Sequence, residues 1–114
     1  MEQLNRIELR GVVGMVRWGS AGERKVANFS LATSRAYNKK DGSPVIDTEW
    51  HSVVAWEGGK IRDLSVIEKG AKLYVTGRMT YRKWTGSDGV DHYDSEVLAA
   101  QIDVINEPLV GQIN

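Results

Sequence analysis

The sequence predicts an all-β protein, a small five-stranded Greek-key barrel with one short helix between the third and fourth strands. Two observations support this fold class. Apolar residues recur mostly at every second position, the period of a strand with one buried face, and short turn sequences containing Asp-Gly separate these stretches. The chain has 114 residues, 41% of them hydrophobic and 26% charged, which suits a single globular domain.

The first two strands are predicted at residues 4–17 and 26–34. The first contains two glycines, Gly11 and Gly14. A long strand bends or bulges at such positions. In the second stretch Ala27, Phe29 and Leu31 fall on one face and polar residues fall on the other, so we expect a half-buried strand.

A hairpin should join the second strand to the third. Residues 38–43 supply turn chemistry, because their Asp-Gly pair tolerates positive φ, and residues 45–57 are rich in β-forming side chains. The period then changes, since apolar residues between Lys60 and Gly70 recur at helical spacing and Gly70 ends the segment as a C-cap would. We therefore expect one short helix there.

The fourth and fifth strands are predicted at residues 71–84 and 92–105, joined by a second turn, TGSDG. The resulting order of three strands, a helix and two strands is typical of the OB fold. Barrels of this type commonly bind oligonucleotides on the second and third strands and on two hairpin loops. A fold alone does not give a function, so the side chains have to carry that argument.

Charge is unevenly distributed along the chain although the net charge is zero. Residues 1–83 hold all 15 Lys and Arg with nine acidic residues, a net charge of +6, and the remaining residues carry −6. A neutral protein can still present a basic face to an anionic partner, because surface fields are screened over about 8 to 10 Å. The alternative is that these charges only solvate the surface.

Several classes of protein are excluded or disfavoured by composition. The chain has no cysteine, which removes disulfides, thiolate catalysis and cysteine-ligated zinc from consideration and suits a reducing compartment. No apolar run approaches the roughly 20 residues of a membrane span, and the N-terminus lacks the apolar region of a signal peptide. We therefore expect a cytoplasmic protein that is not membrane-bound.

Aromatic and cationic residues coincide at the predicted hairpins. Trp50 and Trp56 share strand parity, Trp84 follows Arg82 and Lys83, and Tyr37 lies near Arg35, Lys39 and Lys40. Single-stranded nucleic acid needs such surfaces, since every base has a π-face and every linkage a negative charge. The alternative for each tryptophan is a place in the core or at the barrel end. The predicted phosphate contacts are Arg35, Lys39, Lys40, Lys60, Arg82 and Lys83.

Five segments resemble the bacterial single-stranded DNA-binding protein family in order and spacing: NRIELRG, VANFSLATS, TEWHSVVAW, EKGAKLYVTGRM and YRKWTGSDG. The resemblance covers about residues 4–105. It implies an OB fold, a homotetramer, and sequence-tolerant wrapping and protection of single-stranded DNA in replication, recombination and repair, at the nucleoid. It also implies that the stacking aromatics are Tyr37, Trp50, Trp56 and Trp84.

The resemblance places His51 at a subunit interface. Strand parity puts Glu49 and Val53 on the same face as His51, opposite to Trp50 and Trp56, and Tyr74 of the fourth strand is a candidate neighbour. The alternative for His51 is a core histidine with its hydrogen bonds satisfied. We expect residues 1–107 to form the DNA-binding domain and 108–114 a short C-terminal extension. Many family members continue into a linker and an acidic tip that recruits other proteins, whereas this chain stops at NEPLVGQIN, so we do not expect such recruitment. The resemblance implies no role for Trp18, which could either fill the end of the barrel as a hydrophobic plug or contact DNA.

Two other functions remain as alternatives. Asp88, Asp91, His92 and Asp94 could form a metal or nuclease site, but a second nearby histidine is missing and the acids follow a solvated turn. We therefore expect no catalytic residues, no metal site and no cofactor. The second alternative is an OB-fold accessory module of a primosome or recombination complex that binds DNA weakly and proteins strongly.

Overall fold

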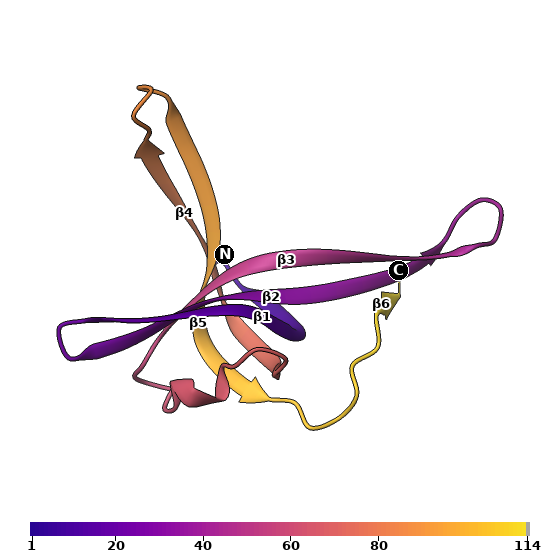
Figure 1. Cartoon of the computed structure of the whole chain (residues 1–114), viewed down its shortest axis with the longest axis horizontal. Coiled ribbons are helices and arrows are strands. Elements are labelled where there is room, and N and C mark those ends of the chain that lie inside the picture. The colour runs from indigo at the N-terminus through magenta and orange to yellow at the C-terminus, as the bar shows by residue number, and fades with distance from the viewer. Residues whose placement is uncertain (114) are drawn as a thin grey trace.

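The computed structural model describes residues 1–113 and is almost entirely β-sheet (Figure 1). Its elements are β1 (Ile7–Ala21), β2 (Arg24–Asn38), β3 (Pro44–Trp56), the 3-10 turn η1 (Leu64–Val66), β4 (Lys72–Thr85), β5 (Asp91–Val104) and β6 (Gln112–Ile113). The sheet order is β1-β4-β5-β3-β2, and a further β1–β2 pairing closes it into a barrel. The prediction of a five-stranded Greek-key barrel is thus confirmed. The short β6, which was not predicted, pairs in parallel with β2.

Strand β1 can join both neighbours because it bends. It pairs with β4 from Ile7 to Val12 and with β2 from Val12 to Ala21, and the β1–β2 register shifts between Val13 and Val16. This irregularity contains Gly14, one of the two glycines at which a bend or bulge was predicted. A bulge increases local twist, which a strand needs when it turns from one side of a small barrel to the other.

The core follows from the strand alternation. Ala27, Phe29 and Leu31 of β2 are buried, as their shared parity predicted, and Val53 and Ala55 of β3 meet them from the next strand. The other members of the core cluster are Leu9, Val13, Ile61, Leu64, Ile67, Leu73, Val75, Val97 and Ala99. The described residues include no fully buried polar or charged side chain.

The helix predicted between Lys60 and Gly70 is reduced to the single 3-10 turn η1. Its first turn is held by Asp63, whose side chain accepts a hydrogen bond from the backbone N–H of Ser65. The apolar spacing that suggested a helix has another cause, because Ile61, Leu64 and Ile67 are all buried in the core cluster. Burial in the core, rather than a helical period, therefore explains their spacing.

The β2–β3 and β4–β5 hairpins extend well beyond the barrel in different directions, and the β1–β2 hairpin projects in a third (Figure 1). We define the β2–β3 arm as residues 34–48 and the β4–β5 arm as residues 80–96. Both ladders run without a bulge through these ranges, to Asn38 opposite Pro44 and to Thr85 opposite Asp91. The Asp-Gly turns were predicted correctly, since Gly42 and Gly89 both have positive φ. Within residues 1–113, no helix has the length and hydropathy of a membrane span.

Candidate nucleic-acid interface

The aromatic residues of the β2–β3 and β4–β5 hairpins divide between two faces. We call the side of each hairpin that continues the core-facing side of the barrel its inner face, and the opposite side its outer face. Trp50 and Trp56 have the opposite parity to buried Val53 and Ala55 and therefore share the outer face, as predicted. Tyr37 has the parity of buried Leu31, so it lies on the inner face instead. The predicted stacking residues thus do not form one continuous strip.

Trp50 is the most exposed of the four predicted stacking residues, at 62%. Its indole nevertheless has a defined seat on β1. A Cβ atom added to Gly14 would lie 2.5 Å from Cζ3 of Trp50 and 2.7 Å from Oγ of Ser30. That hydroxyl in turn accepts a hydrogen bond from the backbone N–H of Met15. The missing side chain at Gly14 therefore makes room for the Trp50 ring.

Trp56 is half-buried at the end of β3 and is covered by a cation. The guanidinium carbon of Arg24 lies 5.2 Å from the Trp56 ring centroid, within cation–π range. Arg24 also donates a hydrogen bond of 3.4 Å from Nε to the backbone oxygen of Glu57. The ring is therefore held by the β1–β2 hairpin as well as by its own strand.

Trp84 lies on the outer face of the β4–β5 arm and is 47% exposed. It stacks on His92, directly opposite on β5, with ring centroids 4.3 Å apart and an interplanar angle of 17°. Its indole Nε1–H donates a hydrogen bond of 2.7 Å to Oδ2 of Asp94. One face and one edge of the ring therefore already have partners within the chain.

Tyr37 belongs to a smaller group on the inner face of the β2–β3 arm. The guanidinium carbon of Arg35 lies 5.0 Å from the Tyr37 ring centroid. The same guanidinium donates from NH2 to Oδ2 of Asp47, the cross-strand neighbour of Arg35, at 3.0 Å. Arg35 thus joins a ring and a carboxylate near the arm tip.

The predicted phosphate contacts differ in their surroundings. Arg35 is paired with Asp47, and Lys83 Nζ lies 3.3 Å from Oδ2 of Asp91. Exposed pairs of this kind contribute little, so a phosphate can replace the carboxylate at low cost. The other four predicted contacts, Lys39, Lys40, Lys60 and Arg82, are exposed and belong to no ion pair of the described residues. Of these, Lys60 lies away from both arms, next to Gln101 of β5.

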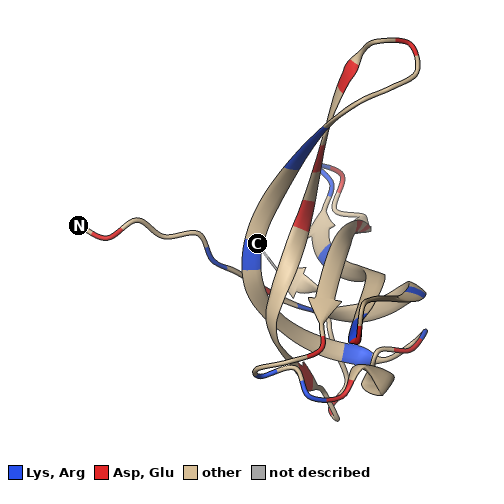
Figure 2. Ribbon diagram, turned by 90° about the vertical axis from the view of Figure 1, so that its left-hand side faces the viewer, with Lys and Arg blue, Asp and Glu red and all other residues tan. Residues whose placement is uncertain are grey.

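Charges that are separated along the sequence are interleaved in space. Strand β5 carries most of the C-terminal acids and lies between β4 and β3 in the sheet. Figure 2 shows acidic residues along the β4–β5 arm together with its Lys and Arg. Arg82, for example, lies opposite Asp94. The basic character of residues 1–83 therefore does not produce a uniformly basic face on this arm.

A groove of about 480 Å³ lies where the two arms diverge. Trp50 and His51 line it from β3, Arg82 from β4, and Tyr93 and Glu96 from β5. It connects the Trp50 region to the β4–β5 arm. The groove wall is mixed in charge, because Arg82, Asp94 and Glu96 all line it.

Exposed aromatic residues outside the predicted sites lie on the β4–β5 arm and on the β1–β2 hairpin. Tyr81 and Tyr93, on the inner face of the β4–β5 arm, are 74% and 72% exposed. Lys83 lies directly opposite Tyr93 on that face. The parity shared by Tyr81 and Lys83 in the sequence was the signal that could have identified them. Trp18, on the β1–β2 hairpin, is 54% exposed, so it is not a buried plug of the barrel end.

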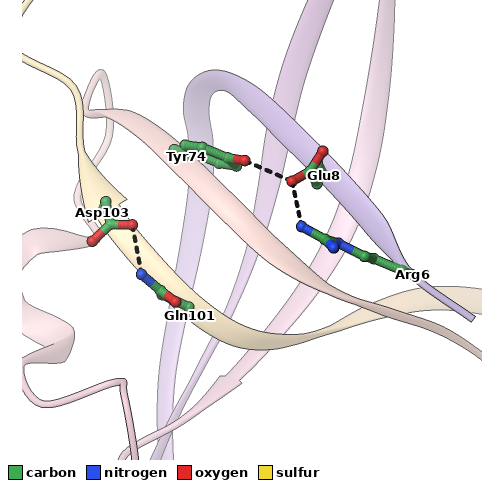
Figure 3. A network of polar contacts seen from close by, with 5 residues as sticks. All are labelled: Arg6, Glu8, Tyr74, Gln101 and Asp103. Carbon is green, nitrogen blue, oxygen red and sulfur yellow. Dashed lines mark hydrogen bonds and ion pairs between the residues drawn. The ribbon is translucent and has the colours of Figure 1, made fainter.

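His51 and Tyr74, the predicted interface residues, lie on different parts of the barrel. His51 is half-buried on β3, and its Nε2 shares a hydrogen bond of 2.8 Å with Oγ1 of Thr33 on β2. Tyr74 lies on β4 beside β1, where its hydroxyl donates to Oε1 of Glu8 at 2.7 Å (Figure 3). Val53, which shares the parity of His51, is in the core and cannot reach a partner chain.

The carboxylate of Glu8 is the centre of the polar network in Figure 3. The hydrogen bond from Tyr74, followed by the hydrogen bond and charge of Arg6, lowers the pKa of Glu8 below its ordinary value. The guanidinium of Arg10 covers the Tyr74 ring at 5.4 Å. On the neighbouring β5, Gln101 donates to Asp103 at 3.0 Å. This surface of β1, β4 and β5 is therefore ordered by polar side chains.

The acidic residues of the possible enzymatic site have structural partners. Asp88 accepts from the backbone N–H of Val90, and Asp91 accepts from the hydroxyl of Thr85 and pairs with Lys83. Asp94 accepts from Trp84, and His92 stacks on the same ring. In residues 1–113, no three His, Asp or Glu side chains are grouped as a metal site would require. The cluster shapes the arm tip.

Comparison with known proteins gives a consistent result. Residues 4–105 match the family model described as the single-strand binding protein family. The chain is 33% identical over 107 residues to the single-stranded DNA-binding protein of Neisseria meningitidis serogroup A, covering 90% of this chain and 60% of that protein. It is 33% identical over 107 residues to the single-stranded DNA-binding protein 1 of Chlorobaculum tepidum, covering 90% of this chain and 65% of that one. The chain thus spans about three fifths of the length of these relatives.

Two solved structures of single-stranded DNA-binding proteins have the same fold as this chain. The SSB of Plasmodium falciparum in complex with ssDNA aligns with a TM-score of 0.75 and 31% identity, over 92% of this chain and 96% of that one. A deletion mutant of the single-stranded DNA-binding protein from Thermus aquaticus aligns with a TM-score of 0.71 and 25% identity, over 90% of this chain and 51% of that one.

Proposed function

This chain belongs to the single-strand binding protein family, and we propose that it binds single-stranded DNA with little sequence preference. In this role it would hold and protect the strand during replication, recombination and repair. The proposal is supported by the similarity to an SSB whose structure contains ssDNA. It is supported equally by the barrel itself, since OB folds bind oligonucleotides on strands 2 and 3 and on the loops between strands 1 and 2 and between strands 4 and 5.

One observation carries the proposal: tryptophan rings on the outer faces of β3 and of the β4–β5 arm are solvent-accessible yet held by contacts within the chain. Trp50 rests against Gly14 and Trp84 stacks on His92. Burial in a core would satisfy these rings without leaving a free face. Stacking on an aromatic ring contributes about 1 to 3 kcal/mol per base and accepts any base. Trp56 and Tyr37, each covered by an arginine, would serve as further stacking residues.

Phosphates would be bound by cations next to these rings. Lys39, Lys40 and Arg82 are cations of the arms that belong to no ion pair of the described residues, and Arg35 and Lys83 would exchange their carboxylate partners for phosphate. Lys60 would contact a strand only where it continues past the barrel end, since Lys60 lies next to Gln101. Bases would face the rings while the backbone follows the cations, the arrangement that sequence-tolerant binding requires.

Assembly and location form part of the same proposal. We propose a homotetramer in the cytoplasm, associated with the nucleoid, in which several barrels offer one strand a continuous path. His51 and Tyr74 are the candidate interface residues. The role is that of a binding protein without catalysis, metal or cofactor, with residues 1–107 as the binding domain.

The deciding experiment is a fluorescence titration with oligo(dT) and with a duplex of equal length. Stacking should quench tryptophan emission by the single strand much more than by the duplex. Trp84→Ala should weaken binding by about 1 to 3 kcal/mol per engaged base. Equal affinity for duplex and single strand would refute the proposal. Weak binding of both would favour the alternative of an accessory module that binds mainly proteins.

A further inference from the structure

Trp84 lies near the tip of the β4–β5 arm, and two side chains of the opposite strand hold its ring although the ring is partly exposed. His92 covers one face of Trp84 at a centroid separation of 4.3 Å. Asp94 binds the indole Nε1–H at 2.7 Å. The stack limits tilting of the ring, and the hydrogen bond opposes its rotation about the side-chain bonds.

The turn beyond Trp84 makes room for His92. A Cβ atom added to Gly86 would lie 3.2 Å from Nε2 of His92 and 2.8 Å from Oδ1 of Asp88. The turn is closed by hydrogen bonds from the N–H of Gly86 to the oxygen of Val90 and from the N–H of Gly89 to the oxygen of Gly86. The imidazole is thereby half-buried on an arm that is otherwise exposed.

We infer that His92 and Asp94 are positioning residues that make Trp84 a prebuilt, one-sided stacking platform. The inference rests on the proposed function, because the ligand is a base of single-stranded DNA. The imidazole occupies the place that a second base would take, so the arm tip receives one base, on the face of Trp84 opposite His92. A ring that is already fixed loses less side-chain freedom on binding than a free one.

Affinity measurements with oligo(dT) test the positioning role. His92→Ala should bind about 2- to 10-fold more weakly than wild type, since the ring must then be ordered by the ligand. His92→Phe, which keeps a stacking ring, should recover most of that loss. In a Trp84→Ala background His92→Ala should have no further effect, because interacting residues are non-additive. Val90→Ala, an exposed side chain at the same turn, is the matched control and should bind as wild type.

The contribution of Asp94 needs a separate comparison, because losing a negative charge should by itself favour DNA binding. Asp94→Asn and Asp94→Ala lose the same charge, but only asparagine keeps an oxygen that can accept from the indole. Asp94→Ala should therefore bind more weakly than Asp94→Asn. Equal affinities of these two variants would remove Asp94 from the inference.

A spectroscopic measurement reports the platform without depending on affinity. The chain has two histidines, so His51 is an internal reference for the ring protons of His92. Those of His92 should resonate upfield, under the ring current of Trp84, and lose this shift in Trp84→Leu. When oligo(dT) is added, the nuclear Overhauser effects between His92 and Trp84 should persist while new ones join the thymine methyl group to Trp84.

The outcomes separate the inference from the proposed function. If wild type binds oligo(dT) but His92→Ala binds equally well, or if a base displaces His92 from the ring, the inference is wrong and the proposed function stands. If Trp84→Ala binds as wild type, the platform is likewise refuted, and binding depends on other rings. If wild type does not prefer single strands, both fail.

Discussion

The indole of Trp50 lies against the backbone of Gly14, so closely that a Cβ atom at position 14 would lie 2.5 Å from Cζ3 of the ring. The two residues come from β1 and β3, with β2 between them. The exposed ring of Trp50 on β3 thus occupies space that is free only because residue 14 of β1 has no side chain. The placement of a stacking residue and the composition of β1 are therefore linked.

Gly14→Ala should displace the Trp50 ring and weaken binding of oligo(dT). The added methyl group meets Trp50 and Ser30 at less than contact distance, so overpacking should also destabilise the fold by about 1 to 3 kcal/mol. Fluorescence titration and thermal unfolding measure the two effects. Gly19→Ala is the matched control on the same strand, because a Cβ there meets only Val26, at 3.4 Å. Equal affinities of the two variants would contradict the seat proposed for Trp50.

Binding should weaken with salt in proportion to the number of phosphates contacted. For a single strand, log K falls with log salt with a slope of about −0.7 per phosphate neutralised. Lys39→Gln and Lys40→Gln should each flatten that slope by about 0.7 without changing base preference. Lys69→Gln, in the turn before β4, should leave it unchanged. A slope that is the same in all three variants would exclude the tip of the β2–β3 arm from the phosphate path.

His51→Tyr should shift the protein toward monomer at low concentration if His51 lies at a subunit interface. The larger ring would overfill a packed contact, and DNA binding would weaken indirectly because assembly precedes it. Analytical ultracentrifugation over a dilution series measures this. Thr33→Val, which removes only the hydrogen-bond partner of His51 within the chain, is the control. If both variants lose stability but assemble as wild type does, the role of His51 is internal to the fold.

The Tyr74–Glu8 hydrogen bond should make stability depend on pH. Because the folded protein lowers the pKa of Glu8, the contribution is present at neutral pH and is lost as the pH falls through the lowered value. Tyr74→Phe should therefore reduce the urea midpoint at pH 7 more than at a pH well below the ordinary glutamate value of 4.5. In a Glu8→Gln background this pH dependence of the Tyr74→Phe effect should disappear. A pH-independent effect would mean that Tyr74 acts through packing alone.

Much of the barrel could be predicted from local patterns. Alternation of period two placed Phe29 and Leu31 inside and Trp50 and Trp56 together outside, because successive side chains of a strand point to opposite faces whatever the strand pairs with. The two Asp-Gly turns could also be predicted from local sequence, because glycine readily adopts the positive φ found at Gly42 and Gly89. The helix was predicted longer than the 3-10 turn found there, because three apolar residues at helical spacing can also be buried one by one in the core, and only the tertiary structure decides between the two.

The sequence by itself therefore determined the strands, the faces of the arms and the aromatic residues available for stacking. Tertiary structure decided what each of these residues touches, because the partners lie far apart in the chain. Gly14 meets Trp50 only through the barrel, and His92 reaches Trp84 only through the register of the β4–β5 ladder. Tertiary structure also decided the distribution of charge. Because β5 lies between β4 and β3, the acidic residues that follow Lys83 in the sequence lie beside the basic residues of these neighbouring strands. A periodicity records which side of a strand a residue faces, whereas the neighbour on that side depends on how the sheet closes.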